Sequence, residues 1–253
     1  MDDLPEESLD EAVKQFISGN SNKQGAVRPP PHLEKGLASI ESFLLWAKLD
    51  REKAAERREE YWKARLELFG DVDIEDPSYA KELVQEMKTG AIQLPLGYHD
   101  NNGRQLVVVR PRLLDYSVLT PMTVLKYFWF IMHQVAKKGS NQIFVINDLH
   151  KVSPSKNIRV QTLKLVARSI SSVLPIRLAG VCIVRQPFFF GAIWSVFSLL
   201  LSPKIRSRVK FLGDDLAALM EHFPKSSVPS ELGGEMNWNH EDWLLKVSST
   251  SPN

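Results

Sequence analysis

The segment PFFFGAIWSVFSLLLSPKIRSRVKFLG, residues 187–213, joins an apolar stretch directly to a basic one. The apolar part, residues 187–201, is interrupted only by one glycine and two serines. A helix that crosses a membrane needs about 20 apolar residues, so this stretch is too short to span a bilayer. A helix that is apolar on all sides must be buried, or must place one face on a protein core and the other on a lipophilic surface.

The basic part of the segment decides how this helix is interpreted. It carries Lys204, Arg206, Arg208 and Lys210 and no carboxylate. Apolar side chains beside basic residues are typical of proteins that bind the surface of an anionic membrane. Two interpretations remain open on the pattern alone. The helix is either a central core element or a movable lid, whose small residues thin its packing.

The charge of the chain is strongly polarised. The net charge is only +2, but residues 149–213 contain eleven Lys and Arg and no Asp or Glu. A chain with this distribution presents one region suited to an anionic surface. We therefore expect an anionic membrane as a partner, and not a nucleic acid.

Strand and helix patterns alternate through residues 91–253. Apolar runs at 106–109, 142–149, 180–185 and 209–213 are typical of buried strands, and amphipathic or apolar helices lie between them. Thr120 and Pro121 open the first of these helices, and Gly139 follows its end. Alternating strands and helices predict an α/β fold with a mostly parallel sheet.

The N-terminal part has a different character. Residues 1–31 are polar and are predicted to be a mostly flexible tail, in which a helix around Leu9–Ile17 is the one candidate element. Residues 32–90 predict a small all-helical domain. Two of its helices are expected to meet near Leu49 and Asp50, and a third follows Pro77. The acidic start lacks the basic-then-apolar order of a secretion signal, and the single cysteine, Cys182, cannot form an internal disulfide. We expect an intracellular protein.

Motifs for catalysis and for metal binding are missing from the sequence. The chain has no GxxxxGK[ST], GxGxxG or GxSxG pattern, and its six histidines lack metal-ligand spacing. An enzyme with an unrecognised site would centre on Asp148, at the end of an apolar strand, and on His133. We expect no catalytic residue, no metal and no cofactor.

Several motifs together carry a family resemblance. PIRLAGVCIVRQPFFFGAIWSVFSLLLSPKIRSRVKFLG, followed by LMEHFP, VPSELGGE and Trp243, resembles the C-terminal half of a CRAL-TRIO (Sec14-like) lipid-binding domain. The resemblance extends upstream through LPLGYHDNNGRQLVVVRP and FVINDL, covers about residues 33–245, and is strongest to the branch of tocopherol- and retinal-transfer proteins. It implies a CRAL-TRIO-like fold. In that fold a mostly parallel sheet flanked by helices encloses an apolar cavity for one lipophilic molecule, and the helix at 188–201 is a gate over it.

The resemblance also implies a site for phosphoinositide headgroups. The basic positions of that cleft match Arg177, Lys204 and Arg208, whereas a further basic position falls on Ala179. With Arg206 and Lys210, these residues are the expected membrane-binding set.

The polar positions that phosphatidylinositol-carrying members use are replaced here. Ile176 stands where those members have Glu, Ile205 where they have Thr, and FLLWAK replaces a more basic motif. Because a buried inositol phosphate needs polar partners, a less polar cargo is favoured over phosphatidylinositol. We expect a tocopherol-, retinoid-, carotenoid- or sterol-like molecule, or a fatty acyl chain.

Periodicity and position in the fold select the residues expected to line the cavity. They are Phe130, His133, Val145, Val166, Ile170, Ile183, Phe188, Ile193, Trp194, Phe197 and Leu200. The favoured function is a monomeric, cytoplasmic carrier that associates reversibly with membranes. The alternatives are a phosphatidylinositol-transfer protein, a lipid-sensing module that recruits a protein partner without transfer, and the enzyme centred on Asp148 and His133.

Overall fold

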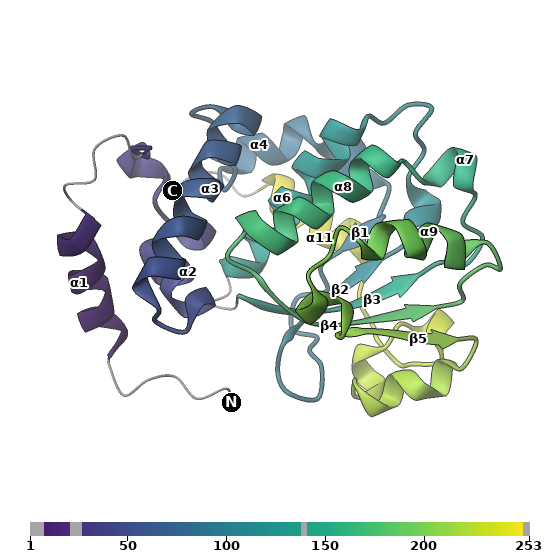
Figure 1. Ribbon diagram of the computed structural model, residues 1–253. Helices are drawn as coiled ribbons and strands as arrows, with labels where there is room; N and C mark the ends of the chain where they lie inside the picture. Colours follow the sequence, from purple (N-terminus) through teal and green to yellow (C-terminus); the bar gives the residue numbers. More distant parts are fainter. Residues whose placement is uncertain (1–7, 21–26, 138–140, 250–253) are drawn as a thin grey trace.

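A five-stranded sheet and an N-terminal group of helices make up the molecule (Figure 1). The computed structural model describes residues 8–20, 27–137 and 141–249. Within these residues, no helix is long and apolar enough to cross a bilayer.

The strands follow one another across the sheet in the order β1-β2-β3-β4-β5. The first pair is antiparallel, and the other three pairs are parallel, so the predicted mostly parallel α/β sheet is confirmed. The strands are β1 (Ile92–Gln93), β2 (Gln105–Val109), β3 (Gln142–Asp148), β4 (Arg177–Val184) and β5 (Val209–Gly213). A turn at Asn102 and Gly103 precedes β2, and Gly103 has the positive φ of 75° that such a turn requires.

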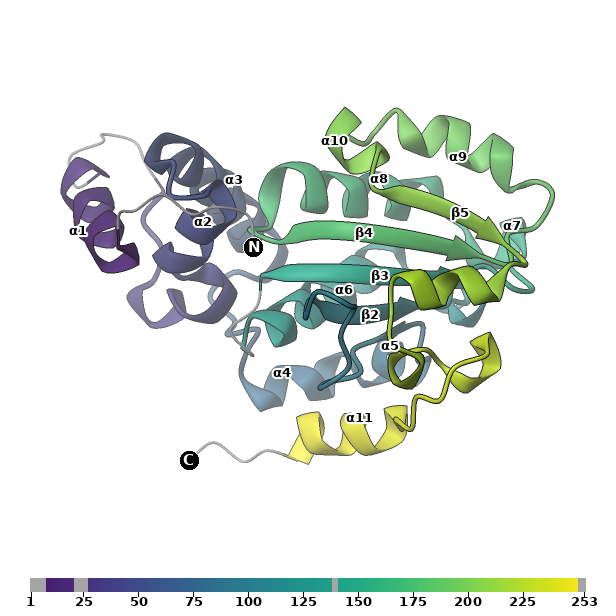
Figure 2. The same cartoon turned by 90° about the horizontal axis from the view of Figure 1, so that it is seen from below.

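Helices cover one face of the sheet, and 3-10 turns cover the other. The first set is α6 (Pro121–Ala136), α8 (Val160–Arg168) with the π turn Ser169–Val173, α9 (Phe190–Ser198) and α10 (Pro203–Arg206). The second set is η5 (Leu216–Glu221), η6 (Lys225–Ser227) and η7 (Ser230–Leu232). Figure 2 shows α9 and α10 above β5 and β4, with the C-terminal helix α11 (His240–Ser249) at the opposite side of the molecule. The short elements η3 (Pro111–Leu113) and α7 (Pro154–Asn157) lie in the loops.

The side-chain alternation of the strands separates two cores. Phe144, Ile146 and Cys182 pack with the 3-10 turns on one face. Residues of the opposite parity on β3, such as Ile143 and Val145, face α6 and α8. The second of these faces holds the site described below.

The predicted helical domain contains four helices. They are α2 (Ile40–Ala47), α3 (Arg51–Phe69), α4 (Pro77–Glu82) and α5 (Val84–Lys88), and short 3-10 turns lie at Pro31–Leu33 and Gly36–Ala38. Asp50 caps α3, because its side chain accepts a hydrogen bond from the Lys53 amide at 3.1 Å. The boundary predicted near residue 90 falls between α5 and β1 and remains a prediction.

The predicted tail over residues 1–31 contains a helix that packs on the rest of the protein. Leu9–Asn20 form α1, whose Ala12 and Phe16 are buried in the main core. This helix is amphipathic, and its apolar face packs on α2 and α3. The rest of the predicted tail lies partly outside the described residues.

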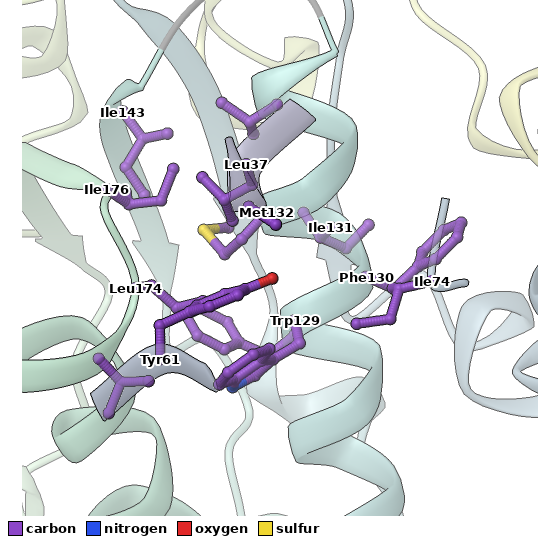
Figure 3. Packing of buried hydrophobic residues seen from close by; sticks show 14 of the residues in the cluster. Leu37, Tyr61, Ile74, Trp129, Phe130, Ile131, Met132, Ile143, Leu174 and Ile176 are labelled. Carbon is purple, nitrogen blue, oxygen red and sulfur yellow. The ribbon is translucent and has the colours of Figure 1, made fainter. Parts of the chain in front are cut away.

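The main core joins the N-terminal helices to the sheet unit. Tyr61 of α3 stacks on Trp129 of α6, with 5.4 Å between ring centroids and 21° between ring planes (Figure 3). Both side chains are fully buried, as is Leu174 at the end of the π turn. A contact of this kind fixes α3 against α6, so the N-terminal helices share one core with the domain that carries the cavity.

Candidate functional site

An apolar cavity of about 240 Å³ lies between the sheet and the helices α6, α8 and α9. Strands β2, β3 and β4 form its floor and present mainly Val, Ile and Leu. Helix α9 closes it with Phe190, Ile193, Trp194 and Phe197. The walls also include residues of α6, α8 and the loops, among them Val124, Phe128, Met132, Leu149, Val152, Leu163, Val166 and Ile170.

Seven of the eleven residues predicted to line the cavity are in its wall. They are Val145, Val166, Ile170, Ile183, Ile193, Trp194 and Phe197. Whether they contact a cargo stays a prediction.

The other four predicted lining residues lie elsewhere. On α6, Phe128 and Met132 face the cavity. Phe130 follows Phe128 by about 200° of helix rotation, and it is buried on the far side of the helix from Ile143 (Figure 3). Phe188 is 100% exposed and Leu200 is 37% exposed. Both lie just outside α9, where the chain no longer faces the cavity.

His133, the fourth of these residues, belongs to a buried hydrogen-bond network between α3 and α6. Its Nε2 lies 3.0 Å from the Tyr61 hydroxyl, and its Nδ1 lies 3.1 Å from Glu75 Oε1. Burial lowers the pKa of His133, although the Glu75 carboxylate opposes this. A neutral ring therefore accepts from Tyr61 and donates to Glu75. The network ties the N-terminal helices to α6.

Asp148, the other residue of the enzyme hypothesis, has different partners. Its carboxylate is fully buried and accepts hydrogen bonds from Arg112 at 2.7 Å and from Arg185 at 2.7 and 3.0 Å. Burial favours the neutral acid, but Arg185, the His150 amide and Arg112 outweigh it, and the pKa of Asp148 is lowered. Asp148 and His133 are each paired within their own network, and no hydrogen bond or ion pair joins the two in the described part of the chain.

Helix α9 shows how an all-round apolar sequence is accommodated. One face covers the cavity, whereas Val196, at 54% exposed, and the adjoining Leu199, at 77% exposed, point outward. No residue of α9 is fully buried, and neither helix end has a side-chain cap. The central-core interpretation is therefore wrong for this helix, which lies over the cavity with an apolar outer face.

A basic cleft of about 470 Å³ lies at the amino ends of the strands, beside α2, α3 and α10. Three of the predicted membrane-binding residues line it: Arg177, Lys204 and Arg208. Four more cations in its wall were not predicted from the sequence: Lys48, Lys53, Arg57 and Arg104. Among the described residues, no carboxylate lines the cleft.

Some of these cations hold the structure as well. Arg57 donates to the carbonyl oxygens of Ser171 at 2.8 Å and Leu174 at 2.9 Å, and burial lowers its pKa to about 10. Arg177 donates to the Trp46 carbonyl at 3.0 Å. Lys204 sits on α10 and is exposed, and no ion pair involves it within the described part of the chain.

Two predicted membrane-binding residues are not in the cleft wall. Arg206 is exposed on α10 outside the cleft. Lys210 lies 3.1 Å from His222 Nε2. Alternation along β5 places Lys210 on the opposite side from Phe211, which contacts Trp194 of α9. Ala179 and Ile205 also line the cleft, so it is less polar than its charge suggests.

The cavity and the cleft share part of their walls. Ile170 and Leu178 line both spaces. The two spaces are therefore neighbours, separated by two aliphatic side chains. None of the described residues form a cluster suited to a metal ion.

A family model described as the CRAL/TRIO domain matches residues 89–234, which is more than half of the chain. The chain belongs to the CRAL/TRIO family. The matched region contains the cavity, helix α9 and the sheet, whereas α1 to α5 precede it.

Curated relatives extend the comparison beyond this region. The CRAL/TRIO chain is 24% identical to clavesin-2 of Homo sapiens over 186 residues, which is 69% of this chain and 54% of the relative. It is 26% identical to the phosphatidylinositol transfer protein CSR1 of Eremothecium gossypii, over 67% of this chain and 38% of that protein. It is 25% identical to tyrosine-protein phosphatase non-receptor type 9 of Homo sapiens, over 94% of this chain and 39% of that protein. The chain thus spans about half or less of the length of these relatives.

A solved structure supports the fold. The crystal structure of Sfh5 superposes with a TM-score of 0.57 at 13% identity, covering 91% of this chain and 85% of that one. At this identity the likeness concerns the fold of the CRAL/TRIO domain and its N-terminal helices.

Proposed function

We propose that this CRAL/TRIO domain binds one lipophilic molecule in its cavity and exchanges it at anionic membranes. Binding of lipids is what the family and its relatives support. The observation that carries the proposal is an apolar cavity closed by a helix that is apolar on both faces. Such a helix shields the cargo from water and can also lie against lipid.

The basic cleft would orient the protein on an anionic membrane. Its cations surround a space large enough for a charged headgroup, and each basic residue near an anionic surface is worth about 1 kcal/mol. Because α10 links the cleft to the gate, a headgroup held by Lys204 and Arg208 would place α9 at the membrane. The protein would then associate with membranes peripherally and reversibly, without a cofactor.

The dimensions and chemistry of the cavity favour a compact, weakly polar cargo. A volume of about 240 Å³ lies below the usual range of about 300–1,000 Å³ for ligand pockets, so a lipid with two acyl chains would have to displace α9. Ile176 is buried and lines the cleft, where an inositol headgroup would require a polar partner. A tocopherol-, retinoid- or sterol-like molecule needs a smaller displacement of α9 than a two-chain lipid and brings no charged headgroup, whereas a carotenoid-like molecule needs as large a displacement.

A phosphatidylinositol-binding function is the second candidate. The shared wall at Ile170 and Leu178 would let a headgroup occupy the cleft while an acyl chain enters the cavity. The CSR1 relative carries this function in its name. A lipid-sensing module without transfer differs from both candidates in holding its lipid during membrane contact.

The test is the uptake of labelled lipids from vesicles by two matched variants of α8. Val166 lines the cavity, whereas Val160, on the same helix, is 53% exposed. Val166→Phe should fill part of the cavity and lower the uptake of α-tocopherol, retinol and cholesterol, whereas Val160→Phe should leave uptake unchanged. Equal uptake by both variants would contradict the proposal. Preferential uptake of phosphatidylinositol would select the second candidate.

A further inference from the structure

Ser202 lies at the junction between helix α9 and the basic cleft. It directly precedes Pro203, the first residue of α10, and Figure 2 shows α10 at the start of β5. The Ser202 side chain is exposed and lines the cleft together with Lys204 and Arg208. A group added to its hydroxyl would therefore enter the cleft.

The segment around Ser202 is accessible and held by few contacts. The backbone at Ser202 is extended, with φ −61° and ψ 153°, as expected for a residue that precedes proline. Its hydroxyl oxygen accepts a hydrogen bond from the Ile205 amide at 3.3 Å. Helix α10 has only four residues, and none of them is buried. A segment with so few buried contacts can open locally without disturbing the core, so an enzyme can reach the hydroxyl.

Three of the described residues are a serine or threonine followed by proline: Thr120, Ser153 and Ser202. The Thr120 hydroxyl accepts from the Thr123 amide at 3.1 Å in the capping box that begins α6. Ser153 is half-buried, and its amide donates to Asn157 Oδ1 at 2.7 Å. Neither of these two residues lines the cleft. Ser202 is therefore the one of the three whose modification would change the charge of the cleft.

The cleft lacks the negative charge that would repel a phosphate group. Among the described residues no carboxylate lines it. Lys204 and Arg208 follow Ser202 by two and six residues, and neither forms an ion pair with a described carboxylate. A phosphoserine carries about −1.5 to −2 charges at pH 7 and three strong acceptor oxygens, for which Lys and Arg are the natural partners. A phosphate on Ser202 would thus be paired by cations close to it in sequence.

The N-terminal helices supply cations on the other side of the cleft. Lys48 follows α2, and Lys53 and Arg57 belong to α3. Arg57 is held by the carbonyl oxygens of Ser171 and Leu174, which carry no net charge, so its positive charge is not cancelled. A phosphate in the cleft therefore has cations on both sides.

We propose that Ser202 is a phosphorylation site whose phosphate group occupies the basic cleft and weakens binding to anionic membranes. This inference rests on the proposed function, because it regulates the cleft that is assigned there to the membrane. A protein kinase that requires proline after its acceptor would transfer the γ-phosphoryl group of ATP. A bond forms between Ser202 Oγ and the γ-phosphorus, and the bond from that phosphorus to the β–γ bridging oxygen breaks. ADP leaves, and the hydroxyl proton passes to the catalytic base of the kinase.

The first experiment tests whether the native chain is a substrate. The full chain is incubated with ATP and either a mitogen-activated or a cyclin-dependent protein kinase, both of which require proline after the acceptor, and the phosphorylated sites are located by peptide mass spectrometry. We expect phosphate on Ser202 of the wild-type chain and its loss from this segment in Ser202→Ala and Pro203→Ala. Absence of phosphate from Ser202 with both kinases would overturn the assignment of the site.

The second experiment tests whether the phosphate occupies the cleft. Phosphoserine is genetically encoded at position 202, and the phosphate is titrated by ³¹P NMR in the folded chain and in the same chain unfolded in urea. Cations favour the dianion, so the pKa of the phosphate should be lower in the folded chain. Lys204→Ala should reduce this difference more than Arg206→Ala, which changes a residue of α10 outside the cleft wall. An equal pKa in the folded and unfolded chains would show that the phosphate stays outside the cleft.

The third experiment measures membrane binding with a matched control. Ser207 is exposed directly after α10 and does not line the cleft, so phosphoserine encoded at position 207 adds the same charge to the same segment. Neutralisation of Lys204 and Arg208 should weaken sedimentation with phosphoinositide-containing vesicles about 30-fold for phosphoserine at 202, the equivalent of ~2 kcal/mol. The loss for phosphoserine at 207 should be several times smaller. Equal losses would mean general charge repulsion and would overturn the proposal.

These experiments separate the inference from the proposed function. Failure of the unphosphorylated chain to bind phosphoinositide-containing vesicles would refute the membrane role of the cleft, and the NMR titration would still decide whether the phosphate occupies it. Vesicle binding that is normal in the wild-type chain and unchanged by phosphate on Ser202 would refute the inhibitory role alone.

Discussion

Phe188 is the side chain that should contribute most to membrane binding. It precedes helix α9 and is 100% exposed, and its only ring contact among the described residues is the edge-on one with Phe189 at 5.5 Å between centroids. Transfer of a phenylalanine side chain from water to an apolar environment is worth about 1.5–3 kcal/mol. Loss of about 2 kcal/mol in Phe188→Ala corresponds to about a 30-fold weaker partition onto vesicles.

The structure also predicts what this substitution leaves intact. Because Phe188 packs on almost nothing in the protein, the free energy of unfolding should change by less than about 0.5 kcal/mol. Leu245→Ala is the matched control: Leu245 is 67% exposed on α11, which lies across the molecule from α9 (Figure 2).

Sedimentation with vesicles that contain anionic lipid measures both variants. We expect the loss for Phe188→Ala alone. Equal partition of Phe188→Ala and wild type, or an equal loss for Leu245→Ala, would refute the orientation of the gate toward the membrane.

Three further predictions concern the cleft, the buried histidine and the thiol. Lys204→Ala should weaken binding to phosphoinositide-containing vesicles about fivefold, the equivalent of ~1 kcal/mol, and more than Arg206→Ala on the same helix; equal effects would mean that the cleft is not involved. Burial lowers the pKa of His133, so the unfolded chain binds the extra proton and the free energy of unfolding should fall as pH drops below 6.5. His133→Gln should make that fall shallower in urea titrations at pH 7.5 and 5, and an unchanged slope would contradict the assignment. Burial raises the pKa of Cys182 to about 12, so the native thiol should resist alkylation at pH 8 and react on unfolding; rapid labelling of the native chain would disprove its burial.

The sheet and most of its helices could be predicted because the hydrophobic periodicity agrees with the residues that begin and end the helices and turns. Thr120 and Pro121 do open α6, and Asp50 does cap α3. The position of α1 could not be predicted, because its apolar face is recognised only once α2 and α3 provide a surface for it. Tertiary packing decided that element, and local sequence did not.

Single residues of the cavity wall could be predicted from the sequence only in part. Strand alternation correctly placed Val145, and because the predicted strand covers residues 142–149, alternation also places Asn147 on the same face. On α6 the residues from Tyr127 to Met132 are all apolar or aromatic, so periodicity could not tell the face of Phe128 from that of Phe130. The cleft cations Lys48, Lys53 and Arg57 were missed because they are more than a hundred residues away from Arg177 in the sequence.

Native mass spectrometry of the purified chain, followed by organic extraction, tests the central claim most directly. We predict one bound lipophilic molecule per chain, which Val166→Phe fails to retain and Val160→Phe keeps. A chain that purifies empty and takes up no lipid from vesicles would contradict the carrier function and leave a membrane-recruited interaction module in its place.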